Sequence, residues 1–162
     1  MPQAKSMRLP TSTEWDLLVM SSRDIHWIGM YSWCTDVTIR HVPGHAARGC
    51  LSPRHWQLIT TMRDESVGFR PAVADKSDIP DGTTITTGTL YMDGEPIKVP
   101  VHPTWGGDVP DYIPRAALEL REPLADPAYQ VKAIKVGNIL IADRVLIKRI
   151  SYGDLAEQGL CC

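Results

Sequence analysis

The sequence has little of what marks several large classes of protein. Its 162 residues contain no apolar run close to the roughly 20 residues that a membrane-spanning helix needs, and the first residues lack the apolar core of a secretory signal. Its 17 basic residues stand against 19 acidic ones, so there is no positive excess for binding nucleic acid or an anionic membrane. We therefore expect synthesis in the cytoplasm, no nucleic-acid partner and no membrane insertion.

Cysteine is scarce, and its spacing suggests no disulfide framework. Cys34, His41, His45 and Cys50 have the spacing C-x6-H-x3-H-x4-C, which could hold zinc tetrahedrally. The spacing matches no standard zinc finger and contains no C-x2-C pair. We therefore interpret the two cysteines as buried thiols and the histidines as loop residues, and expect no metal or other cofactor.

Aromatic residues are unevenly placed: four of the five tryptophans and the single phenylalanine, Phe69, lie before residue 70. This distribution indicates different cores in the two halves. Residues 76–82 are polar, contain a proline and a glycine, and show neither helical nor strand periodicity. We predict a first domain over residues 1–75, a linker over 76–82 and a second domain over 83–162.

The first half contains one clear helix signal. A hydroxyl at Thr11 or Ser12 can cap a helix while Glu14 reaches back to the cap, and an apolar stripe that starts at Trp15 follows at helical spacing. The pattern predicts a helix over residues 12–21. We expect its stripe to pack on Trp33 or Phe69, and the rest of the half to consist of loops and short strands.

The second half has the pattern of a small antiparallel β module. Asp93 and Gly94 tolerate the positive φ angles of a type I′ turn, which predicts a hairpin of residues 84–92 and 95–101. Further strands are expected at 116–122, 129–136 and 139–150, with a tight turn at Gly137-Asn138. A capped helical turn from Ser151 to Gln158, ending at Gly159, closes the chain.

Two segments carry a resemblance to a known family. RLPTSTEW at residues 8–15 is similar to the RLPTEAEWE segment of the formylglycine-generating-enzyme family, and SVGFRPA at 66–72 resembles the GFRPA or GFRLA segment that closes the same fold. The resemblance covers about residues 8–74. It implies an α+β protein: a C-type-lectin-like first half with one or two short helices, followed by the antiparallel β module.

The family contains copper-dependent oxidases with a reactive cysteine pair, and non-catalytic binders. The binders include phage receptor-binding proteins and the variable proteins of diversity-generating retroelements. Only Cys50 lies anywhere near the closing segment, so the resemblance favours a binder rather than an enzyme. In such binders the variable residues lie just before the closing segment. In this chain they correspond to residues 51–66. The resemblance therefore implies these ligand-binding residues: Ser52, Arg54, His55, Gln57, Leu58, Ile59, Thr60, Thr61 and Arg63.

The residues themselves are compatible with this role, because 51–66 mix every kind of side chain without amphipathic order, as in a displayed recognition surface. An ordinary solvated loop is the alternative. Gly68 should let Phe69 approach a neighbouring backbone, and Arg70 should pair with Glu14 or Asp16. The expected ligand is a protein or glycan surface.

The chain also departs from the family, since only about ten residues precede the LPT segment. We expect a trimmed fold whose missing strands come from the β module or a neighbouring protomer, and therefore a homo-oligomer or a subunit of a larger assembly, such as a displayed phage component.

Several alternatives to a binder remain. A structural subunit of a phage particle and a degenerate metal-dependent enzyme are two of them. A hydrolase could use His26 or His55 with Asp24, Asp64 or Ser52, but no G-x-S-x-G motif occurs. The loop around Trp105 could form a small ligand site, although we favour turn chemistry with Trp105 covering a sheet edge.

Overall fold

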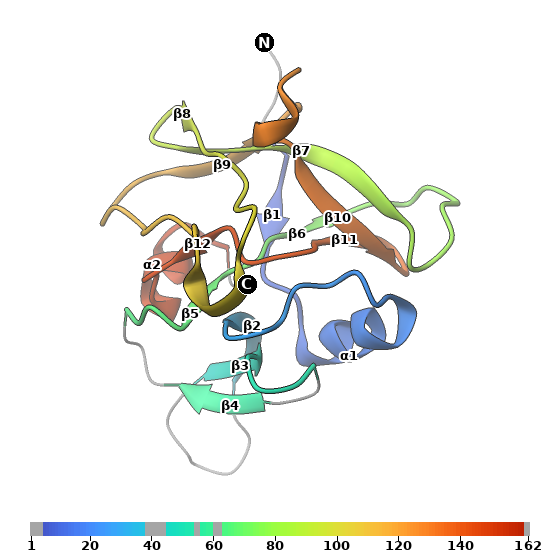
Figure 1. Ribbon diagram of the computed structural model, residues 1–162, viewed down its shortest axis with the longest axis horizontal. Helices are drawn as coiled ribbons and strands as arrows, with labels where there is room; N and C mark the ends of the chain where they lie inside the picture. The colour runs from blue at the N-terminus through green and yellow to red at the C-terminus, as the bar shows by residue number, and fades with distance from the viewer. Residues whose placement is uncertain (1–4, 38–44, 54–55, 60–62, 161–162) are drawn as a thin grey trace.

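The computed structural model describes residues 5–37, 45–53, 56–59 and 63–160 (Figure 1). The chain is mostly β with two short helices, which agrees with the expected α+β class. Its elements are β1 (Met7–Arg8), α1 (Ser12–Ser21), β2 (Tyr31–Val37), β3 (His45–Gly49), β4 (Trp56–Ile59), β5 (Val67–Phe69), β6 (Ala72–Ala74), β7 (Thr84–Met92), β8 (Glu95–Pro96), the 3-10 turn η1 (Thr104–Gly106), β9 (Leu118–Arg121), the 3-10 turn η2 (Pro127–Tyr129), β10 (Val131–Val136), β11 (Ile139–Ala142), β12 (Ile147–Lys148) and α2 (Tyr152–Glu157).

The first sheet has the order β1-β6-β11-β10-β7-β8, with β9 also paired to β7, and its described pairs are antiparallel. The predicted hairpin is confirmed: Met92 pairs with Glu95, and the turn residues Asp93 and Gly94 have φ angles of 52° and 81°. The second strand is shorter than expected. It ends at Pro96, after which one further bond joins the Ile97 amide to Leu90.

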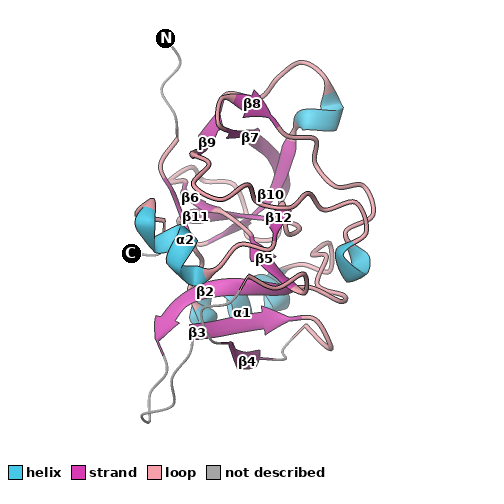
Figure 2. Cartoon of the chain, turned by 90° about the vertical axis from the view of Figure 1, so that its left-hand side faces the viewer, coloured by secondary structure: helices cyan, strands magenta, loops and turns pink. Residues whose placement is uncertain are grey.

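The second sheet has the order β12-β5-β2-β3-β4, in which only the β2–β5 pair is parallel among the described pairs. β12 comes from the second half of the chain and completes a sheet made from the first half. The predicted strand 139–150 is therefore divided, because the chain leaves the first sheet after β11 and joins the second at β12. Figure 2 shows β2, β3 and β4 at one end of the molecule and β7, β8 and β9 at the other.

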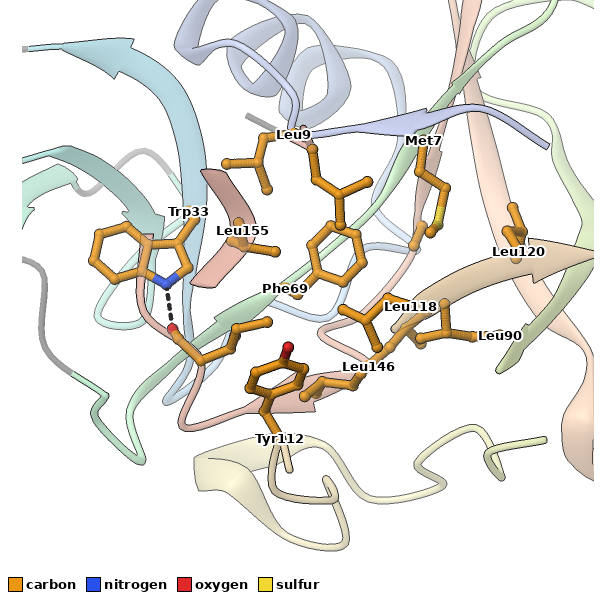
Figure 3. Close-up of a cluster of buried hydrophobic side chains, with 14 of the residues drawn as sticks. Met7, Leu9, Trp33, Phe69, Leu90, Tyr112, Leu118, Leu120, Leu146 and Leu155 are labelled. Atoms are coloured by element: carbon orange, nitrogen blue, oxygen red, sulfur yellow. Dashed lines mark hydrogen bonds between the residues drawn. The ribbon is translucent and has the colours of Figure 1, made fainter. Parts of the chain in front are cut away.

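The two halves share one core, contrary to the expectation of separate cores. The main cluster packs first-half residues such as Leu9 and Phe69 against second-half residues such as Leu118 and Leu146 (Figure 3). The Trp33 indole donates a hydrogen bond of 2.8 Å to the carbonyl of Ile150, which fixes the halves to each other. Residues 76–82 connect β6 to β7, two strands of the same sheet.

Helix α1 has the predicted bounds and cap. Thr11 and Glu14 form a reciprocal capping box, which satisfies orphan amides at the helix start. The expected packing partners are wrong: Trp15 and Leu18 lie in a cluster with Ile134 and Ile141, from β10 and β11, rather than with Trp33 or Phe69. Strands β10 and β11 of the second half, together with Ala72 of β6, thus provide the surface on which the first helix packs.

Helix α2 also follows its sequence signals. Ser151 and Asp154 form its capping box, and Gly159 has a φ of 71° just beyond its end. No helix in the described parts of the chain is both long and apolar enough to cross a membrane.

Candidate functional site

The structure places five of the nine predicted binding residues, on or near the strand at one end of the second sheet. Gln57, Leu58 and Ile59 belong to β4, the last strand of the second sheet, which pairs on its described side with β3. Ser52 is exposed in the turn that follows β3. Four of the predicted residues lie outside the described ranges: Arg54, His55, Thr60 and Thr61.

The start of this segment is held by α1. The indole Nε1 of Trp15 donates a 2.7 Å hydrogen bond to the carbonyl of Pro53. Trp15 is completely buried, so this bond fixes the backbone at Pro53 to the core.

The end of the segment is held by α2. Arg63 donates two hydrogen bonds, from Nε and Nη2, to the carboxylate of Asp154 at 2.8 and 2.7 Å. Asp154 is buried and also belongs to the α2 capping box. The bonds from Arg63 hold the pKa of Asp154 below its ordinary value. Arg63, a predicted ligand contact, thus serves as an anchor of the segment.

The chain after Arg63 is equally fixed. Asp64 accepts hydrogen bonds from the hydroxyl and amide of Ser66, which lower the pKa of this carboxyl group. At Gly68 a Cβ atom would lie only 2.2 Å from the carbonyl oxygen of Ile147. The close backbone approach expected at this glycine therefore occurs, and it allows β12 to pair with β5.

Arg70 lies in the interior, and its expected pairing with Glu14 or Asp16 is wrong. Its guanidinium donates to the Ser32 hydroxyl and to the carbonyls of Ala142 and His26, and it lies 4.9 Å from the centre of the Trp15 ring. Complete burial lowers its pKa to about 10. The two carboxylates pair elsewhere, Glu14 with Arg8 and Asp16 with Arg48.

Trp105 lies on a turn, as the favoured interpretation of the sequence expected, but its ring is more exposed than expected. It does not cover a sheet edge; 69% of its surface is exposed, on the turn η1. Its φ of 57° and ψ of 29° are left-handed, a conformation that is uncommon for a bulky residue. Its amide donates to the carbonyl of Ile28, and at Gly29 a Cβ atom would lie 2.4 Å from the indole ring. Only glycine at position 29 allows the ring to lie there.

Hydrogen bonds to Asp108 fix the two ends of the loop that carries Trp105. The Asp108 carboxylate accepts the amides of Val101 and His102 at 2.7 and 2.8 Å. Burial alone would raise the pKa of Asp108, but these bonds outweigh it and hold the pKa below the usual value. Val109 then packs with Met30 and Val145 in a small core cluster. The ring is therefore presented from a fixed backbone.

A cleft of about 190 Å³ lies beside the ring, lined by Gly29, Cys50, Glu65, Ser66, Trp105 and Lys148. We call it the Trp105 cleft. It is continuous with the predicted binding segment, since Cys50 immediately precedes Leu51 and Ser52. Cys50 has a φ of 74° and is buried, and burial raises the pKa of its thiol. A nucleophilic cysteine needs the opposite shift.

The charged groups around the cleft pair with one another. Arg149 bonds Glu65 at 3.0 Å and lies 3.4 Å from Asp111, while Lys148 lies 3.8 Å from the same aspartate. These paired side chains offer both donors and acceptors at the surface without an excess charge of either sign.

His26, one of the histidines nominated for hydrolysis, lies near Asp24 and Asp143 but also near two cations, Arg144 and Arg70. His26 lies 3.1 Å from Arg144, and burial together with this cation lowers the His26 pKa. Within the described ranges no three His, Cys, Asp or Glu residues form a metal-binding group. Of the four possible zinc ligands, Cys34 and Cys50 are buried, whereas His41 and the side chain of His45 fall outside the description.

Comparison with models of protein families, with curated proteins and with solved structures found no match to this chain.

Proposed function

We propose that the protein is a non-catalytic recognition protein that presents residues 51–66 on a C-type-lectin-like scaffold. Its ligand is a protein or glycan surface, and the scaffold functions as a homo-oligomer or as part of a larger assembly such as a phage particle. The motifs RLPTSTEW and SVGFRPA support the scaffold assignment. The geometry around the segment supports the binding role.

The observation that carries the proposal is that both ends of the segment are fixed to the core. Pro53 is held by the buried Trp15, and Arg63 by the buried Asp154. Each side chain immobilised on binding costs about 0.5–1.5 kcal/mol, and a backbone fixed in advance reduces the ordering that recognition requires. Sequence can therefore change between the two anchors while the framework remains in place.

The raised pKa of the Cys50 thiol and the mutual pairing of the charges near the cleft further support binding over catalysis. A nucleophile or general base requires a group whose pKa is shifted toward its task. The ionisable groups of the Trp105 cleft are instead arranged as neutral pairs.

A display library tests the proposal. Ser52, Arg54, His55, Gln57, Leu58, Ile59, Thr60 and Thr61 are randomised together, while Trp15, Pro53, Arg63 and Asp154 are kept. We expect most members to fold, with melting temperatures close to that of the parent, and binders to soluble test proteins such as lysozyme to be selectable. The matched control library randomises eight exposed positions outside the segment: Thr13, Leu17, Met20, Lys76, Ser77, Asp78, Thr84 and Glu95.

The outcomes are distinct. If most members of the segment library unfold, the segment is core and the proposal is wrong. If they fold but yield no more binders than the control library, the segment is an ordinary loop, and an assembly subunit becomes the better description.

A further inference from the structure

We propose that the Trp105 cleft binds a neutral saccharide, with one pyranose ring stacked on the Trp105 indole. This inference rests on the proposed recognition function and names the ligand class of one part of its surface. It extends that surface beyond residues 51–66, to a loop from the other half of the chain.

The first argument is the position of the aromatic ring. Trp105 is 69% exposed and is not an isolated apolar side chain, because Ile28 and Leu51 extend the exposed apolar surface on the adjacent backbone. The left-handed backbone at Trp105 and the absence of a side chain at Gly29 keep the ring in place. A rigid aromatic face provides contact area with little loss of side-chain entropy on binding.

The second argument is the polar surroundings of the ring. Glu65 and Ser66 offer oxygen acceptors, the Ser66 hydroxyl proton being donated to Asp64, and Lys148 offers an ammonium group as a donor, all on the lining of one cleft. Because Arg149 and Asp111 pair with Glu65 and Lys148, the cleft has no net charge that would select an ion. Sugar hydroxyls both donate and accept hydrogen bonds, so a neutral polyhydroxyl ligand fits these groups better than a charged peptide or a nucleotide.

The third argument is size. The cleft holds about 190 Å³, which is below the roughly 300–1,000 Å³ of sites for drug-sized molecules. It has room for one sugar ring. A longer glycan would leave the cleft past Leu51 and Ser52, toward the segment that we propose to be variable.

The experiment uses the full chain labelled with nitrogen-15 and the methyl glycosides of glucose, galactose, mannose and N-acetylglucosamine. The probe signal is the Trp105 indole N–H resonance, assigned by its disappearance in Trp105→Asn, since asparagine tolerates the left-handed backbone. At least one glycoside should move this resonance saturably, with a Kd on the order of 1 mM as expected for a ligand of this size. The buried indole of Trp33, bonded to Ile150, should not move.

The control variant is Met20→Ala, because Met20 has the same exposed fraction as Trp105, 69%, but lies on α1. Trp105→Asn should weaken binding at least about tenfold, measured by saturation transfer to the glycoside, as for a central contact residue. Met20→Ala should leave it unchanged. Equal binding by Trp105→Asn and the parent would overturn the proposal.

Different results would refute the saccharide proposal and the proposed recognition function. If none of the glycosides binds at up to about 50 mM, well above the expected range, the saccharide proposal is wrong. If the Trp105 indole then moves only when a protein target selected from the segment library is added, the cleft belongs to a protein contact, and the recognition function stands without its glycan.

Discussion

Replacing Trp15 with alanine tests both the packing of the two halves and the anchoring of the segment. Trp15 is fully buried among residues of β6, β10 and β11, and removal of a buried tryptophan typically costs about 3–5 kcal/mol. The substitution also removes the hydrogen bond to Pro53 and the ring beside the Arg70 guanidinium. A single domain is usually stable by only about 5–15 kcal/mol, so the loss is a large part of the total.

The assay is thermal unfolding followed by circular dichroism. For a chain of 150–250 residues, each 1 kcal/mol lowers the melting temperature by about 2–4 °C, so Trp15→Ala should melt about 6–20 °C below the parent. Leu17→Ala is the matched control, because Leu17 lies on the same helix but is 46% exposed. Surface changes of this kind alter stability by about 0.5 kcal/mol or less.

Trp15→Phe separates packing from anchoring, since it keeps much of the apolar ring but cannot donate to Pro53. We expect a loss of about 1 kcal/mol, together with faster proteolytic cleavage between Pro53 and Arg63. A melting temperature of Trp15→Ala within 2 °C of the parent would refute the packing argument, and unchanged proteolysis of Trp15→Phe would refute the anchor.

Three further predictions follow from single contacts. Gly68→Ala should destabilise by more than about 2 kcal/mol, measured by denaturant unfolding, because the new methyl group meets the Ile147 carbonyl at 2.2 Å. Asp154→Asn should destabilise by about 1–3 kcal/mol at pH 7, because the buried partner of Arg63 loses its charge. The pKa of Asp154 is lowered in the folded protein, so the contribution of its charge to stability is complete above the ordinary value of 3.8. This contribution is lost as the pH falls through the lowered pKa. The free energies of unfolding of the parent and of Asp154→Asn should therefore converge in acid. Cys50, buried with a raised pKa, should react with iodoacetamide at pH 8 much more slowly than a free thiol, as followed by mass spectrometry of its peptide; rapid alkylation of the folded protein would contradict this.

Local signals in the sequence located both helices and the β7–β8 hairpin. The capping boxes at Thr11 and Ser151 gave the starts of both helices, and Asp93-Gly94 gave the hairpin, because each depends on hydrogen bonds or φ angles within a few residues. The expected close approach at Gly68 also occurs. Such features need no knowledge of the rest of the chain.

The errors concern partners that are distant in sequence. The Arg70 guanidinium donates to the Ala142 carbonyl rather than to a carboxylate near it in sequence. A buried guanidinium has five N–H donors, and these need several acceptors at once. The bond from Arg63 to Asp154, which spans 91 positions, was also not foreseen, while the contact of Arg63 with a ligand stays a prediction. The position of Trp105 depends on a contact with Gly29 that no local pattern contains. The role of β4 and its neighbours in binding stays a prediction.

The exchange of strands between the two halves has a consequence during synthesis. Among the described strand pairs, β5 has its antiparallel neighbour in Ile147–Lys148, and α1 packs in part on β10, which begins at Val131. Near the beginning of the chain, the Leu9 amide bonds the carbonyl of Leu160. A nascent chain that ends near residue 80 therefore exposes Trp15 and Phe69 to solvent, however complete its motifs. We therefore expect the first half to become stable only once residues 131–160 are free to pack on it.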